Sequence, residues 1–185
     1  MNHKSKGFAY ALNFERLKQS IKDEYFYEAL MIEFAMIEDR IYTLFFKLGL
    51  CKIDFCLNSN QQKIFENFMG NRARFIDLFS RLKYLLKLIE LPISFDQESK
   101  TPPALAARSI LIPHKEIVIN LVGLLVDWSH QRNVFVHSLL SGSLNLENDK
   151  LKVFVKNGLL HIRNIDKLVR KIKSVKPDIV ISQSR

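Results

Sequence analysis

The sequence has few of the residues that interrupt helices or crosslink a chain. It contains 6 Gly and 5 Pro among 185 residues, and four of the prolines lie between positions 92 and 113. The segments on either side of this region are therefore free to form long helices. The 2 Cys, Cys51 and Cys56, have no second pair, so cysteine alone cannot complete a tetrahedral zinc site. We expect two reduced thiols, as is usual in the cytoplasm.

The common signatures of catalytic and cofactor sites are also missing. The sequence has no glycine-rich dinucleotide motif, no phosphate-binding P-loop, no H-E-x-x-H zinc motif and no G-x-S-x-G nucleophile motif. These absences argue against the corresponding oxidoreductases, nucleotidases, metallopeptidases and α/β-hydrolases. The 5 His are not spaced as metal ligands with nearby carboxylates. We therefore expect no metal and no cofactor.

The hydrophobic pattern predicts an all-α protein, an antiparallel, up-and-down bundle of four to five main helices. Residues 91–112 are expected to form the longest loop, and the β-like residues of 144–157 predict a short strand or hairpin. The apolar segment 25–48 is interrupted by acidic residues and Arg40, so it does not predict a membrane span. We expect one domain over 1–185, located in the cytoplasm without membrane association. The expected helices cover about 10–20, 22–48, 60–90, 114–140 and 159–175.

The last of these helices is basic on one side. Its pattern places Leu160, Ile165, Leu168, Val169 and Ile172 inward. The formal net charge of the chain is +9, and much of the excess lies between positions 150 and 176. Such a surface attracts polyanions, although a solvated helix face that keeps the protein soluble is the alternative. The candidate RNA-binding residues on the outward side are Arg163, Lys167, Arg170 and Lys171.

The stretch Arg132-Asn133-Val134-Phe135-Val136-His137 is the strongest candidate for chemistry. Arg-x4-His with Asn, Asp or His after the Arg is expected about 0.04 times by chance in a chain of this composition. It lies near the end of the most apolar expected helix. Arg can donate two hydrogen bonds to a phosphate, and His can transfer protons near neutral pH. A solvated helix end is the alternative explanation.

This motif resembles the signature of HEPN domains, a family of helical-bundle ribonucleases and nucleotide-binding modules. The segment EFAMIEDRI, Glu33 to Ile41, is also similar to segments of bacterial members. The resemblance covers the motif strictly and the bundle loosely, over about 22–175. It implies a metal-independent endoribonuclease that leaves a 2′,3′-cyclic phosphate, with Arg132, Asn133 and His137 as catalytic residues.

The resemblance also implies a biological setting and an alternative. RNA is the implied partner, the role is that of a toxin or phage-defence effector, and an antitoxin protein is a further implied partner. Related toxins carry Tyr two residues after the motif His, where this chain has Leu139, so silencing by adenylylation at that position is not expected. The alternative is a noncatalytic HEPN module that binds a nucleotide, RNA or a partner protein.

Helix geometry adds a constraint on the motif. Positions five apart on a regular helix point about 140° from one another and lie about 7.5 Å apart along the axis. Arg132 and His137 therefore share one phosphate only if the helix breaks near 134–136 or a twofold homodimer combines both pairs; family members commonly dimerise, and we expect a homodimer. Glu38 and Asp39 are candidates to form a salt bridge with Arg132, and acidic residues on an exposed strip of the helix are the equal alternative. We expect His130 at a solvated helix end and Trp128 in the core or the dimer interface.

Overall fold

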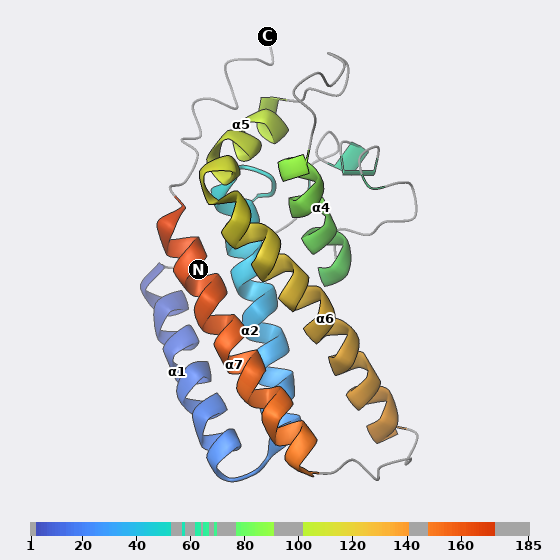
Figure 1. The fold of residues 1–185 in the computed structure, drawn as a ribbon. Helices are drawn as coiled ribbons and strands as arrows, with labels where there is room; N and C mark the ends of the chain where they lie inside the picture. The colour runs from blue at the N-terminus through green and yellow to red at the C-terminus, as the bar shows by residue number, and fades with distance from the viewer. Residues whose placement is uncertain are drawn as a thin grey trace.

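The structure is a computed structural model that describes residues 3–52, 57, 62–63, 65–66, 69, 77–90, 102–140 and 148–172. These residues form helices and no strand, which confirms the all-α bundle. In Figure 1 the long helices α1, α2, α6 and α7 lie alongside one another, and α4 packs beside α6. The elements are α1 (His3–Lys22), α2 (Phe26–Lys47), α4 (Leu78–Glu90), α5 (Pro102–Leu111), the 3₁₀-helix η2 (Ile112–His114), α6 (Lys115–Leu140) and α7 (Asn148–Lys171).

Local sequence explains where α2 ends and where α4 begins. Gly49 has φ 72, and the backbone N–H groups of Gly49 and Leu50 donate to the carbonyls of Phe46 and Phe45. This Schellman motif uses the freedom of glycine in the left-handed region, as expected for a helix stop. At the start of α4, the carboxylate of Asp77 accepts a hydrogen bond of 3.0 Å from the backbone N–H of Ser80. Asp77 thus caps the helix.

The strand or hairpin predicted over 144–157 is wrong where the structure describes it, because α7 begins at Asn148 and is helical throughout; residues 144–147 lie outside the described residues. Leu151, Phe154, Val155, Ile162 and Ile165 recur at helical spacing and are all buried. Tertiary packing of this face outweighs the β propensity of the local sequence. Leu160 was also predicted inward, but 52% of it is exposed and Ile162 is buried in its place.

Two other elements differ from the sequence prediction. Helix α1 begins at His3, earlier than expected, and α5 occupies part of the predicted loop over 91–112. Two prolines, Pro102 and Pro103, begin α5, where proline lacks only a hydrogen bond that the first turn does not make. Residues 91–101 and most of the predicted helix between 60 and 76 lie outside the described residues. Cys51 is buried, and its thiol donates to the carbonyl of Tyr42 at 3.9 Å; Cys56 also lies outside the described residues.

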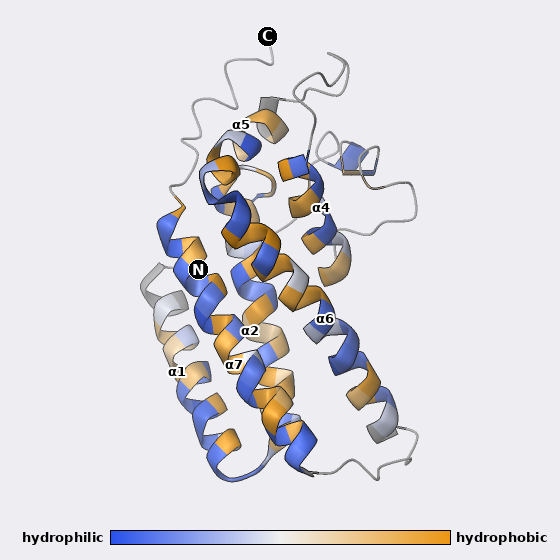
Figure 2. Ribbon diagram, in the orientation of Figure 1, coloured by the Kyte–Doolittle hydropathy of each residue, from blue (hydrophilic) through white to orange (hydrophobic). Residues whose placement is uncertain are grey.

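The segment Ala104–Ser138 is long and apolar enough to cross a membrane by length and composition alone. Hydrophobic segments recur along the first half of α6 (Figure 2), and 28% of the most apolar window is buried. Length and composition do not separate a membrane span from the core helix of a soluble bundle. The cytoplasmic location therefore stays a prediction.

A buried carboxyl group lies where α2 packs against α7. Glu33 of α2 is fully buried, and its carboxyl group has no side-chain partner among the described residues; the nearest polar partner is the backbone amide of Leu159 on α7. It lies directly against Gly158 of α7, where a Cβ atom would overlap the carboxyl oxygens. Burial raises the pKa of Glu33 to about 9, although the nearby backbone amide of Leu159 lowers it. The absence of a side chain at position 158 is what makes room for this carboxyl group.

Replacing Gly158 by Ala should therefore destabilise the fold despite the higher helix propensity of Ala. We expect a loss of about 1–3 kcal/mol in the free energy of unfolding, the usual cost of overpacking a core. The double variant Glu33→Ala with Gly158→Ala should lose less than the sum of the single variants, since the new methyl group occupies the space that Glu33 leaves. Urea unfolding of the four proteins measures this coupling, and strict additivity would contradict the contact.

Candidate functional site

Helix α6 carries the motif without a break. It is continuous from Lys115 to Leu140, so of the two alternatives the helix break near 134–136 is excluded. Arg132 is half-buried, whereas Asn133 and His137 are exposed. Since α6 is regular here, the side chains of Arg132 and His137 leave it in directions about 140° apart. A single chain does not bring these two side chains to one cleft.

The guanidinium group of Arg132 packs against α2. Its central carbon lies 4.2 Å from the centre of the Phe34 ring. One terminal nitrogen donates to the sulfur of Met31 at 3.6 Å, and the other donates to the side-chain oxygen of Asn133 at 3.1 Å. The Nε atom is buried without a hydrogen-bond partner among the described residues. The face of Phe34 thus holds the cation in place. The buried Nε is out of reach of a ligand, but each terminal nitrogen has a second N–H beyond the hydrogen bond described above.

Burial lowers the pKa of Arg132, and the nearby charge of Glu38 opposes this effect. A guanidinium group starts from so high a pKa that it stays charged at neutral pH. Its hydrogen bonds to Met31 and Asn133 do not neutralise this charge. Arg132 is therefore a fixed, charged donor that is suited to an anion such as phosphate.

Neither acidic candidate on α2 forms a salt bridge with Arg132. Glu38 accepts a hydrogen bond of 2.5 Å from Arg81 of α4, and Asp39 forms an ion pair of 2.6 Å with the adjacent Arg40. The side chain of Arg81 is fully buried and forms the ion pair with Glu38, one of the two carboxylates considered for Arg132. Sequence spacing could not reveal this pair, because Glu38 and Arg81 lie 43 positions apart in the chain and on different helices.

Asn133 contacts Arg132 directly, since its side-chain oxygen accepts a hydrogen bond from the guanidinium group. His130 is exposed, as expected, and its ring lies 5.1 Å from that of Phe79 on α4. Trp128 belongs to the core, where it stacks on Phe154 of α7 at 5.8 Å. Trp128 is therefore not available to stack on a base.

The basic face of α7 is exposed as predicted, at all four positions. Arg170 forms an ion pair of 2.8 Å with Asp166, and Arg163 lies 5.9 Å from the ring centre of Phe14 on α1. This face lies toward the C-terminal end of α7, whereas Phe154, nine residues before Arg163, contacts Phe135 of α6. Nine helical residues span about 13 Å. Within a single chain, the basic face therefore lies apart from the motif. The exposed cations are Arg163, Lys167, Arg170 and Lys171.

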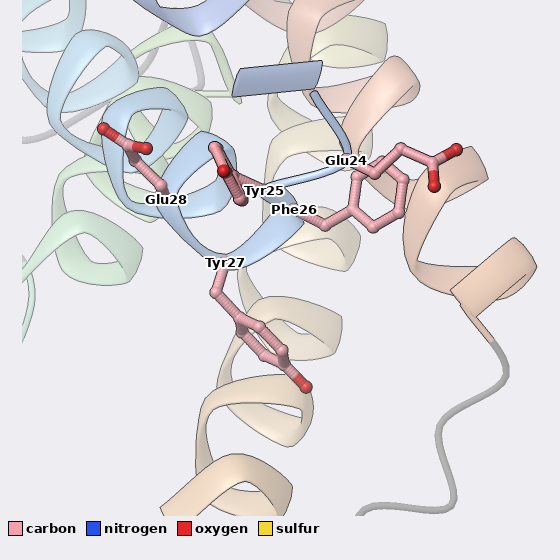
Figure 3. A pocket seen from close by; sticks show the side chains of 5 residues that line it. All are labelled: Glu24, Tyr25, Phe26, Tyr27 and Glu28. Carbon is pink, nitrogen blue, oxygen red and sulfur yellow. The ribbon is translucent and has the colours of Figure 1, made fainter. Parts of the chain in front are cut away.

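The described residues line two open pockets, one beside the motif and one at the start of α2. One is a groove of about 470 Å³ between α6 and α7, and it includes Gln131 and Phe135 of α6. The other, of about 460 Å³, lies at the turn between α1 and α2 (Figure 3). Glu24 in this turn has φ 62, a strained conformation for a residue with a side chain. The second pocket is lined by Glu24, Tyr25, Phe26, Tyr27 and Glu28.

Searches for similar proteins found no matching family model, no curated protein and no solved structure. Within the described ranges, no group of three or more His, Cys, Asp or Glu side chains is arranged to hold a metal ion. The site therefore has to be interpreted from its own geometry. The residues that sequence reasoning missed are Met31 and Phe34, which position Arg132; both lie in an apolar segment whose pattern alone did not distinguish them from ordinary core residues.

Proposed function

We propose that the chain is a metal-independent endoribonuclease of the HEPN type that cuts RNA and leaves a 2′,3′-cyclic phosphate. The observation that carries this proposal is the Arg132 guanidinium group, half-buried over Phe34 and without a carboxylate partner among the described residues, in a motif that ends in an exposed histidine. A phosphate held by Arg132 would be stabilised as charge develops on its oxygens. A cytoplasmic role as a toxin or phage-defence effector, which an antitoxin protein would restrain, belongs to the same proposal.

The proposed chemistry needs two proton transfers. A base removes the proton of the ribose 2′-OH, whose oxygen then attacks the adjacent phosphorus, and an acid protonates the departing 5′-oxygen. His137 is the residue of the motif that can do either near neutral pH. Asn133 orients Arg132 through the hydrogen bond between their side chains. The exposed cations of α7 would bind the flanking phosphates.

A homodimer completes the proposed site. Because Arg132 and His137 diverge on one helix, the His137 that acts beside a given Arg132 would come from a second copy. An exposed apolar side chain in the motif supports such a contact: 65% of Val134 is exposed in the single chain. Further exposed apolar residues on α6 are Ile117, Ile119 and Leu124.

Mixing two inactive variants tests this arrangement. Arg132→Ala and His137→Ala should each be inactive alone, whereas co-expressed chains should regain activity. If random pairing makes half of the dimers mixed, and each mixed dimer has one intact site of two, the mixture should reach roughly a quarter of wild-type activity. RNA cleavage by the co-purified mixture measures this recovery. No recovery, in a mixture shown to contain mixed dimers, would contradict a site shared between chains.

One observation favours a second function, a noncatalytic HEPN module that binds a nucleotide, RNA or a partner protein. His137 is exposed, and within one chain it points away from Arg132. Binding needs Arg132 and the basic face of α7, but it does not need His137. RNA binding that depends on Arg132 without any cleavage would support this second function.

A further inference from the structure

Three side chains of α2, which we call the shelf, extend in a row from Arg132 toward the start of the helix. Tyr27, Met31 and Phe34 are spaced four and three residues apart, so they lie on one face of α2. Phe34 lies beneath the guanidinium group, and the sulfur of Met31 accepts its hydrogen bond at 3.6 Å. Met31 is 53% exposed although it touches Arg132, and Tyr27 is half-buried one turn further along. A ligand held by Arg132 would therefore meet Met31 and then Tyr27.

The shelf opens into the pocket at the turn between α1 and α2. Tyr27 forms one side of this pocket, and in Figure 3 its ring points away from Tyr25 and Glu28. The volume of about 460 Å³ lies in the range of small-molecule sites. The distance along α2 from Met31 to Tyr27 is about 6 Å, one helical turn. A planar group beside Arg132 thus has both a surface to lie on and room at its far edge.

The two carboxylates of this pocket do not exclude a polyanion. Glu28 accepts a hydrogen bond of 2.7 Å from Arg16 of α1. Glu24 forms an ion pair of 2.9 Å with Lys152 of α7, which lowers the pKa of Glu24. Each negative charge is therefore balanced by a cation from a neighbouring helix, and Arg132 remains the nearby cation without a carboxylate partner among the described residues.

We propose that Tyr27 and Met31 form a base-binding shelf, on which a nucleobase of single-stranded RNA stacks while Arg132 holds the adjacent phosphate. Aromatic rings and guanidinium planes are the surfaces on which unpaired bases stack in proteins. This inference rests on the proposed function for the identity of the polyanion. It adds a nucleotide-binding surface on α2, outside the Arg-x4-His motif.

Binding of a short RNA to the His137→Ala protein tests the shelf without interference from cleavage. The probe is a fluorescently labelled single-stranded RNA of eight nucleotides. Tyr27→Ala in this background should weaken binding by roughly 5- to 150-fold, the usual effect of losing one base–aromatic stack. Tyr27→Phe should keep the affinity, since the ring remains. Phe8→Ala is the matched control, because Phe8 is an aromatic residue on another helix, α1, and is 72% exposed.

A second probe shows whether Tyr27 contacts a base. An abasic RNA with the same backbone should bind the parent protein more weakly by a similar factor, and Tyr27→Ala should weaken it no further. Equal affinities of the parent and Tyr27→Ala proteins for the normal RNA would overturn the shelf. So would a Tyr27→Ala protein that binds RNA normally but no longer self-associates, which would assign Tyr27 to a protein interface.

The outcomes separate this inference from the proposed function. If the wild-type protein does not cleave RNA but binding depends on Tyr27 and on the base, the cleavage proposal fails and the shelf stands. If cleavage requires Arg132 and His137 but binding ignores Tyr27, the shelf alone fails. Thermal melting of Tyr27→Ala and Tyr27→Phe identifies any loss of affinity that comes from unfolding.

Discussion

Replacing Glu33 by Gln should stabilise the protein by about 3 kcal/mol at pH 7 and leave its stability nearly unchanged at pH 4.5. Burial raises the pKa of Glu33 in the folded state to about 9, against 4.5 for a solvent-exposed glutamate. Between these values the unfolded chain carries the charged carboxylate while the folded chain holds the neutral acid. Each pH unit in this window costs the folded state about 1.4 kcal/mol, so stability falls as pH rises.

Glutamine has nearly the same shape and is neutral at every pH, so the variant does not have to take up a proton when it folds. The stability difference between the two proteins should grow from about pH 4.5 toward pH 9 and then level off. Urea unfolding of both proteins at pH 5, 7 and 8.5 measures this difference. Parallel pH profiles would contradict a buried, unpaired carboxyl group at position 33.

His161 is a nearby titrating group whose effect on stability has the opposite pH dependence. The comparison of the wild-type and Glu33→Gln proteins removes its effect. His161 lies one turn after Gly158 on α7, and burial lowers its pKa. Its neutral form is favoured in the folded state, so it lowers stability as pH falls below its unfolded value of about 6.5. This contribution is present in both proteins and cancels in their difference.

Replacing His137 by Ala should lower the rate of RNA cleavage by about 10²- to 10⁴-fold, the range that a positioned acid or base contributes. RNA binding should change little, because His137 is exposed and Arg132 retains its contacts with α2. Single-turnover cleavage and equilibrium binding of the same RNA measure the two effects separately. Equal losses in binding and cleavage would assign His137 to RNA binding instead.

The chain offers a matched control on the same helix. His130 is also exposed and lies seven residues before His137, and its ring packs near Phe79. His130→Ala should therefore keep most of the cleavage activity. A loss as large as that of His137→Ala would mean that the motif does not identify the catalytic histidine.

The sequence predicts the bundle because hydrophobic spacing is a local property. Gly49 ends α2 as its position predicts, and Ile165, Leu168, Val169 and Ile172 are buried on α7 as expected. The prediction failed at 148–157, where β-branched and aromatic residues suggested a strand. Their burial against neighbouring helices makes them helical, and no local pattern contains that information.

The candidate site was also predicted in part, where its features are local in the sequence. The motif locates Arg132 and His137, and helix geometry correctly indicates that they diverge if α6 is straight. What holds Arg132 could not be predicted, because Met31 and Phe34 are about a hundred positions away in the chain. The contact between Glu33 and Gly158 also could not be predicted from the sequence. A Glu within an apolar segment suggests an exposed position, and only the long-range contact with α7 explains its burial.

The most direct test of the proposed function is the chemistry of the RNA ends. Purified wild-type and Arg132→Ala proteins are incubated with total RNA and with transfer RNA in EDTA, and the products are analysed for terminal phosphates. The proposal predicts fragments with 2′,3′-cyclic phosphate ends from the wild-type protein and none from the variant. Intact RNA with the wild-type protein, or the same fragments from Arg132→Ala, would contradict a nuclease built on this motif.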